Sequence, residues 1–315
     1  MYHKQFSAAP SGPDFGTKAM ASTDTLSALL ASASIEVTPR EPGVVDTLRD
    51  RFAPGTDVHV TFLPDDSLDN AFETCVRLRR AGFNPIPHLT ARNFTDRDSL
   101  DRQLARMRAE AAVTRALVIA GDVDRPRGAF AASLDVLATG LLEKHGLRDV
   151  LFAGHPEGHP VVADGMLDAA LSEKIATARA RGLAPQIVTQ FCFEAEPVVR
   201  WLLRLRALGI DAPVRIGVAG PASTAALLKF AMRCGVGNSL RALRQRGGAI
   251  GKLMGDTTPE AVLADLASSR APRELGPLAG IHLYMFGGAR KTAEWLDAAR
   301  RRAETAHSPR RIAGQ

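Results

Sequence analysis

Residues 57–90, DVHVTFLPDDSLDNAFETCVRLRRAGFNPIPHLT, contain one complete strand–helix–strand unit. Asp57–Leu63 and Pro85–Thr90 are short, mostly apolar runs, which predict strands that are covered on both faces. Ser67–Ala81 between them has apolar residues at helical spacing and stops at Gly82, a residue type that often ends helices. Because a helical crossover joins the two strands, the unit predicts that they run parallel.

The same unit recurs along the chain. Strand-like runs occur in this order: Ser34–Thr38, Asp57–Leu63, Pro85–Thr90, Ala116–Ala120, Asp149–Ala153, Gln186–Phe193, Val214–Ala219 and Gly280–Phe286. Helical patterns accompany them: Val44–Arg51, Ser67–Ala81, Arg97–Ala111, Ala129–His145, Asp164–Arg181, Glu196–Leu208, Ala222–Cys234, Pro259–Ser268 and Thr292–Glu304. This alternation predicts an α/β fold, a closed (β/α)8 TIM barrel.

An open doubly wound sheet is the alternative for alternating strands and helices. Such a sheet usually has a glycine-rich phosphate-binding turn after its first strand, whereas the first strand here runs into Pro39-Arg40-Glu41-Pro42-Gly43. We therefore expect one catalytic barrel domain over residues 33–304, with a flexible N-terminal tail over residues 1–32 and a C-terminal tail over residues 305–315. Residues 239–255, rich in Gly and Arg, read as an insert before the last unit.

Composition limits where the chain works and what it binds. Of the 315 residues 45% are hydrophobic and 23% charged, which favours a large core and excludes global disorder. No stretch approaches the roughly 18 apolar residues of a membrane span, and no secretory signal is recognisable. Three scattered cysteines suit a reducing compartment. We expect a cytoplasmic protein without a membrane partner. A nucleic-acid partner is not expected either, because the net charge of +6 comes with no recognisable nucleic-acid-binding module. The protein could form a homo-oligomer.

Polar side chains stand at or near the carboxyl ends of the predicted strands, where barrel enzymes carry their chemistry. The most informative is Glu36, inside the first strand, whose carboxylate should face the barrel interior. Burial would raise its pKa, which suits a general acid near neutral pH; a structural ion pair with an arginine is the alternative. Gln190 in the sixth run carries an amide donor and acceptor, which fit either the edge of a heterocycle such as a pterin or a barrel-filling polar role.

Other candidates also have structural alternatives. Asp122 follows Gly121 at a strand end, where it could contact a ligand or cap the next helix. His88 could contact a ligand or be a hydrogen-bonded core histidine. His155 and His159 have H-x-x-x-H spacing, but in a Pro/Gly loop where they need not share a face, so we predict no metal site.

Seven stretches match motifs of one known family, in order and at compatible spacing. Residues 34–39 (SIEVTP) resemble S-F-E-F-x-P, residues 58–62 (VHVTF) resemble V-S-V-T-Y, and residues 87–90 match P-H-L-T. Residues 121–122 match the end of R-G-D, and residues 155–160 (HPEGHP) resemble Y-P-E-x-H-P. Residues 188–193 (VTQFCF) resemble I-T-Q-F-F-F, and residues 282–284 (HLY) resemble H-F-Y. Over about residues 33 to 300 the chain thus resembles the methylenetetrahydrofolate reductase family, in its bacterial catalytic-barrel form.

The resemblance implies an oxidoreductase that uses NADH or NADPH and a non-covalent FAD to reduce 5,10-methylenetetrahydrofolate to 5-methyltetrahydrofolate. It implies three catalytic residues: Glu36 as the general acid that opens the imidazolidine ring, Asp122 near flavin and pterin, and Gln190 on the pterin. Phe230, otherwise a core aromatic of a helix, and Tyr284 would bind substrate with Gln190. The residues implied for the FAD site are Thr61, His88, Gly121, Asp122, Ala131, His155, His159, Asp168 and Lys174.

The chain departs from the family motifs mainly around the implied flavin site. Ala120 stands where R-G-D has its arginine, His155 where Y-P-E has its tyrosine, and the last-strand arginine of the family falls near Gly288. Two alternatives therefore stay open beside the reductase. One is a divergent folate one-carbon enzyme of the same fold with weak or no flavin binding. The other is a non-catalytic subunit that binds folate or flavin.

Overall fold

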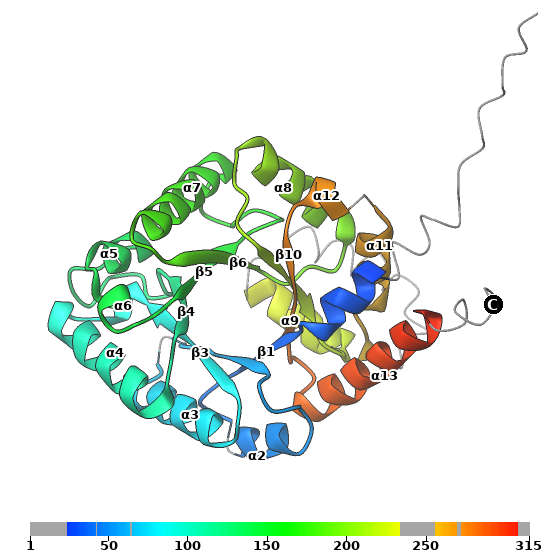
Figure 1. Cartoon of the computed structure of the whole chain (residues 1–315), viewed down its shortest axis with the longest axis horizontal. Coiled ribbons are helices and arrows are strands. Elements are labelled where there is room, and N and C mark those ends of the chain that lie inside the picture. Colours follow the sequence, from blue (N-terminus) through cyan, green and yellow to red (C-terminus); the bar gives the residue numbers. More distant parts are fainter. Residues whose placement is uncertain (1–23, 42, 64, 234–255, 270–271, 308–315) are drawn as a thin grey trace, which may run out of the picture.

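The computed structural model describes residues 24–41, 43–63, 65–233, 256–269 and 272–307. Eight strands close into a barrel in the order β1-β10-β7-β6-β5-β4-β3-β2, and all neighbouring strands are parallel. Their bounds are β1 Ser34–Val37, β2 Asp57–Val60, β3 Asn84–Thr90, β4 Arg115–Ile119, β5 Asp149–Gly154, β6 Ala184–Thr189, β7 Val214–Ala219 and β10 Leu278–Tyr284. The predicted (β/α)8 TIM barrel is therefore confirmed (Figure 1).

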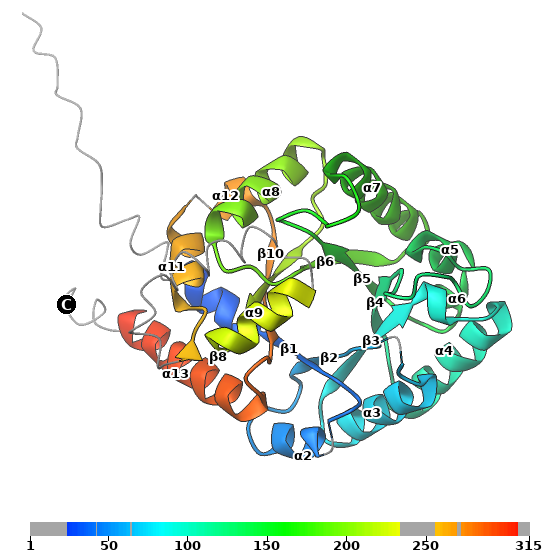
Figure 2. The same cartoon turned by 180° about the vertical axis from the view of Figure 1, so that it is seen from behind.

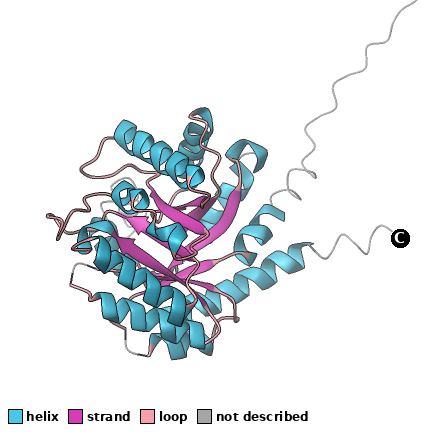
Figure 3. Ribbon diagram, turned by 60° about the vertical axis from the view of Figure 1, so that its left-hand side comes forward, coloured by secondary structure: helices cyan, strands magenta, loops and turns pink. Residues whose placement is uncertain are grey.

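Helices surround the barrel, with the strands inside them (Figure 3). Their bounds are α2 Val44–Arg49, α3 Leu68–Arg80, α4 Arg97–Ala111, α5 Ser133–Ala138, α6 Leu141–Lys144, α7 Asp164–Ala180, α8 Ala195–Ala207, α9 Thr224–Arg233, α11 Glu260–Ser269, α12 Pro272–Leu275 and α13 Ala289–His307. The single helix predicted over Ala129–His145 is instead two, α5 and α6, because Gly140 between them has a left-handed backbone with φ of 73°. A two-stranded antiparallel pair, β8 Ala222–Ser223 with β9 Asp256–Thr257, lies outside the barrel.

The N-terminal boundary differs from the prediction. Residues 24–31, assigned to a flexible tail, form a helix. Leu29 and Leu30 on this helix are buried in the main core, and the Arg300 side chain of α13 donates hydrogen bonds to the carbonyl oxygens of Leu30 and Ala31. The packed part of the chain therefore begins before residue 33, and α13 also continues to His307, beyond the expected end at residue 304.

Two layers of apolar side chains build the barrel. The larger lies between strands and helices. The smaller fills the barrel interior with Ile86, Leu117, Leu151 and Val188, one from each of β3, β4, β5 and β6. These apolar residues fill only the part of the barrel interior next to β3–β6. On the other side, His59 of β2 and His282 of β10 occupy interior positions. The barrel is thus packed rather than hollow, and its polar side is placed next to Glu36.

The two ends of the barrel differ. In Figure 1 the helix over residues 24–31 lies in front, at the amino end of the strands. In Figure 2 the carboxyl end faces the reader and α9 lies in front of β1 and β10. No helix within the described ranges is long and apolar enough to span a bilayer.

Candidate active site

Glu36 points into the barrel near the carboxyl end of β1. Its Oε2 atom lies 3.7 Å from His88 Nε2 on β3 and 3.6 Å from His282 Nε2 on β10. Because β10 and β3 lie on either side of β1, with β2 between β1 and β3, only a carboxylate directed inward can approach both histidines. The side chain is 20% exposed, so solvent or a ligand can reach it.

A hydrogen bond fixes the orientation of His282. Its Nδ1 atom lies 2.9 Å from Ser34 Oγ, the hydroxyl of the residue that is its register partner on β1. The imidazole is 1% exposed and the Tyr284 ring stands edge-on against it at 4.8 Å. Nε2 of His282 is consequently left to face Glu36, which makes this histidine a fixed partner of the carboxylate.

The pKa of Glu36 is shifted opposite to the prediction. Burial acts to raise this pKa, but the interaction with His282 and the charges that His88 and His282 carry when protonated outweigh burial, so the pKa lies below its ordinary value. The prediction of a raised pKa was wrong because it treated the carboxylate as isolated. In the ligand-free protein Glu36 is therefore ionised at neutral pH.

His59 on β2 is the register partner of Glu36 on β1 and was not predicted as a site residue. It is fully buried, and neither ring nitrogen has a hydrogen-bond partner in the described part of the chain. Its ring is 4.4 Å from that of His282 and 5.7 Å from that of His88. Burial, and then repulsion by these histidines and by Arg215 and Arg115, holds its pKa well below the usual value. Burial likewise lowers the pKa of His88 to about 4. His59 and His88 are therefore neutral at pH 7.

Asp122 and Gln190 lie at the same end of the barrel as Glu36. Asp122 is exposed just after β4, and its charge acts to raise the pKa of His88, which places the two near each other. Gln190 directly follows β6 rather than lying within it, and its Oε1 accepts a hydrogen bond from the Phe191 backbone at 3.1 Å. A direct contact between Gln190 and Glu36 is not among the interactions of the described residues, so their pairing across a ligand stays a prediction.

The predicted substrate residues Phe230 and Tyr284 belong to one aromatic cluster. Phe230 of α9 stacks on Phe286 with ring centres 4.1 Å apart. Phe286 in turn contacts Phe191 at 4.8 Å and Tyr284 at 5.7 Å. The Tyr284 hydroxyl donates to the Thr189 carbonyl at 3.0 Å, which ties β10 to the end of β6. Aromatic rings beside Glu36 and His282 suit a flat heterocyclic ligand.

Three buried polar atoms at the ends of β2 and β3 have no hydrogen-bond partner among the residues that the structure describes. They are Thr61 Oγ1, Thr90 Oγ1 and Asn93 Nδ2. Gly121 after β4 lies against them: its φ is 96°, and a Cβ atom there would come within 3.1 Å of Thr90 Cβ. Buried polar atoms are normally hydrogen-bonded, so this region has donors and acceptors available for a polar ligand that approaches the backbone closely, as the implied FAD would.

A second group of predicted flavin residues combines one lysine with two histidines. Lys174 is largely buried, which lowers its pKa, and its Nζ lies 5.6 Å from the centre of the Phe152 ring. His155 packs edge-on against His159 at 5.4 Å, and its pKa is lowered to about 4, first by burial and then by His159 and Lys174. A basic group of this kind fits an anionic part of a ligand, such as a diphosphate. Across the described ranges no three His, Cys, Asp or Glu side chains are arranged to hold a metal ion.

Other predicted positions are engaged elsewhere in the protein. The Asp168 carboxylate pairs with Arg204 of α8 at 3.2 Å, and the Ala131 backbone donates to Asp135 at 2.8 Å. Gly288 has φ of 94°, a conformation in which an arginine at this position would be strained. The insert predicted over residues 239–255 lies outside the described residues.

The chain is similar to known proteins in both sequence and fold. The family model described as methylenetetrahydrofolate reductase matches residues 37–238, more than half of the chain. A 5,10-methylenetetrahydrofolate reductase from Pectobacterium carotovorum subsp. carotovorum is 30% identical over 156 residues, which cover 48% of this chain and 49% of that protein. The match thus spans about half the length of this curated relative.

Among solved structures, an uncharacterised protein from Clostridium thermocellum that binds two copies of 5-methyl-5,6,7,8-tetrahydrofolic acid superposes with a TM-score of 0.53. The superposition covers 87% of this chain and 95% of that one, at 9% sequence identity. Identity this low supports a shared fold and nothing further.

Proposed function

The chain belongs to the methylenetetrahydrofolate reductase family, and from this premise we propose that it reduces 5,10-methylenetetrahydrofolate to 5-methyltetrahydrofolate with NADH or NADPH through FAD. The observation that supports the proposal most is the inward carboxylate of Glu36, held between two imidazoles at the carboxyl end of the barrel. A group that can carry a proton at this position is what ring opening of the substrate requires.

Glu36 would act as the general acid toward a ring nitrogen of the bound folate. The carboxylate is ionised in the ligand-free protein, so it has to gain a proton before it can give one. A flat substrate that covers the exposed fifth of the side chain would remove its remaining water and so raise its pKa. Substrate binding itself would therefore turn the carboxylate into an acid.

His282 is the nearest source of that proton. Its Nε2 faces Glu36 while Ser34 holds the opposite nitrogen, so a His282 ring protonated on both nitrogens would pass its Nε2 proton to the carboxylate and become a neutral imidazole without any movement of the ring. Gln190 and the aromatic cluster around Phe230 would bind the pterin and the rest of the folate. Asp122 would lie beside the flavin and pterin, where its negative charge stabilises positive charge that develops on the opening ring.

The FAD would be held at the carboxyl end by the unpartnered polar atoms and by the group of Lys174, His155 and His159. The residues that would contact FAD are Thr61, His88, Gly121, Asp122, Ala131, His155, His159 and Lys174. Asp168 would contribute less, because its carboxylate is paired with Arg204. FAD bound by these residues would supply the hydride-transfer chemistry between the nicotinamide and the folate. Thr61 and Gly121 would contact its polar edges, and Lys174 would offset the charge of its diphosphate.

The test is the NAD(P)H-dependent formation of 5-methyltetrahydrofolate by protein reconstituted with FAD. We expect turnover by the wild type, loss of at least 100-fold in Glu36→Gln, and unchanged folate affinity in that variant. Glu41→Gln is the matched control, since Glu41 is an exposed carboxylate just after the same strand. Equal activity in Glu36→Gln and Glu41→Gln would refute the role of Glu36.

A second candidate is a folate enzyme of the same family that works without tightly bound flavin. Ala120, at the place of the family arginine, favours it, because that side chain offers no charge to a flavin phosphate. Titration of the flavin-free protein with FAD separates the two proposals. Micromolar or tighter binding supports the flavoenzyme, whereas methyl-folate formation without any flavin supports the second candidate.

A further inference from the structure

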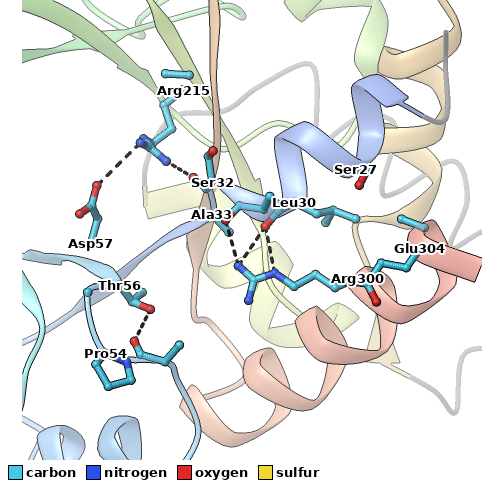
Figure 4. A pocket seen from close by; sticks show the side chains of 15 residues that line it. Ser27, Leu30, Ser32, Ala33, Pro54, Thr56, Asp57, Arg215, Arg300 and Glu304 are labelled. Atoms are coloured by element: carbon cyan, nitrogen blue, oxygen red, sulfur yellow. Dashed lines mark hydrogen bonds and ion pairs between the residues drawn. The ribbon is translucent and has the colours of Figure 1, made fainter. Parts of the chain in front are cut away.

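A cavity of about 630 Å³ lies at the amino end of the barrel, opposite the end that carries Glu36 (Figure 4). Its walls come from the helix over residues 24–31, the segment before β2, the starts of β7 and β10, and α13. Pockets that bind small molecules have volumes of roughly 300–1,000 Å³. The cavity is thus large enough for a metabolite, and it is separate from the candidate active site.

Arg215 brings a buried positive charge to the wall of this cavity. Its side chain is 9% exposed, and the nearest carboxylate, Asp57, lies 3.8 Å away. Asp57 is already bound by Arg115, which donates to both carboxylate oxygens at 2.5 and 2.7 Å, and Asn84 donates to it as well at 3.3 Å. Two guanidinium groups therefore share one carboxylate, which leaves an excess of positive charge in a buried place.

Arg300 of α13 adds a second guanidinium to the cavity. Its Nε and Nη2 atoms donate to the Leu30 carbonyl at 3.1 and 3.0 Å, at the end of the helix over residues 24–31. Arg215 donates to the next part of the same segment, the Ser32 carbonyl. Figure 4 shows both arginines reaching this helix end from different elements. No ion pair between described residues involves Arg300, and the one further acid of the lining, Glu304, is exposed.

We propose that this amino-end cavity binds a small oxyanion, the phosphate or carboxylate group of a metabolite-sized molecule, at Arg215 and Arg300. Guanidinium groups pair with such groups through two parallel hydrogen bonds. Backbone carbonyls already hold both side chains in place, so little side-chain freedom is lost when the anion binds. The bound anion offsets the excess positive charge that remains because Arg115 and Arg215 share the single carboxylate of Asp57.

The experiment uses the full chain with inorganic phosphate and citrate as separate probes, at ionic strength matched with sodium chloride. Binding is followed by calorimetric titration and by the thermal midpoint. We expect at least one probe to bind saturably and to raise the midpoint of the wild type. Arg300→Gln should weaken that binding at least tenfold, whereas Arg301→Gln, which removes the same charge from an exposed position of the same helix, should not.

Ser27→Trp keeps the proposal testable if Arg300→Gln is poorly folded. Ser27 lines the cavity and is partly exposed, so a tryptophan there fills the space without removing charge; the circular dichroism of each variant establishes its fold. Loss of binding in Ser27→Trp supports the cavity as the site. Absence of saturable binding of both probes to the wild type, or equal binding by Ser27→Trp and Arg301→Gln, would overturn the proposal.

Discussion

Acidification from pH 7 to pH 5 is expected to destabilise the protein through His88. The pKa of this histidine is about 6.5 in an unfolded chain and about 4 in the fold, chiefly because burial disfavours its charge. Between these values the unfolded state binds more protons than the folded state, so stability is full above pH 6.5 and falls as the pH drops toward 4. At about 1.36 kcal/mol per pH unit the whole effect is about 3.4 kcal/mol, of which about 2 kcal/mol is lost by pH 5.

The assay is urea unfolding of the flavin-free protein at pH 7 and at pH 5, for the wild type and for His88→Gln. Glutamine keeps a polar group at the site but takes up no proton, so the loss of unfolding free energy on acidification should be smaller by about 2 kcal/mol in this variant. His159→Gln, which replaces an exposed histidine, is the control and should behave like the wild type. Equal pH dependence in wild type and His88→Gln would show that His88 is not held neutral by its surroundings.

Other perturbations test the packing and the ligand site. Asp57→Asn should lower the free energy of unfolding by about 3 kcal/mol, measured in urea, because Arg115 and a second buried arginine lose their shared counter-charge. Cys75 and Cys192 should not react with a thiol reagent until the protein unfolds, since burial raises the pKa of Cys75 to about 12 and that of Cys192 well above its usual value; fast labelling of either of these two residues in the native protein, located by peptide mass spectrometry, would contradict this. Phe230→Ala should weaken folate binding about tenfold in an equilibrium titration, since it removes the outer ring of the aromatic cluster; unchanged affinity would place the folate elsewhere.

The barrel could be predicted because its strands are covered on both faces, which leaves continuous apolar runs in the sequence. The predicted Arg97–Ala111 and Val214–Ala219 agree with the observed bounds of α4 and β7. The helix over residues 24–31 was missed because its apolar residues span little more than one turn and the stretch has few other helix signals. Its burial depends on α13, nearly the whole chain away, and local sequence patterns do not report such contacts.

The site was predictable in its position but not in its electrostatics. Polar residues at strand ends placed Glu36 at the carboxyl end of the barrel, since parallel strands bring those ends together. The convergence of His59, His88 and His282 depends on barrel closure, which makes the first and last strands neighbours. Each histidine alone reads as an ordinary core residue, so the lowered pKa of Glu36 could not be foreseen from spacing.

A crystal structure with bound 5-methyltetrahydrofolate measures most directly whether Glu36 does chemistry on a folate. We expect the pterin at the carboxyl end of the strands, with a ring nitrogen within hydrogen-bond reach of the Glu36 carboxylate, directly or through one water, and with the Gln190 amide on the pterin edge. Folate density away from both side chains, with Glu36 still enclosed by its histidines alone, would contradict this expectation.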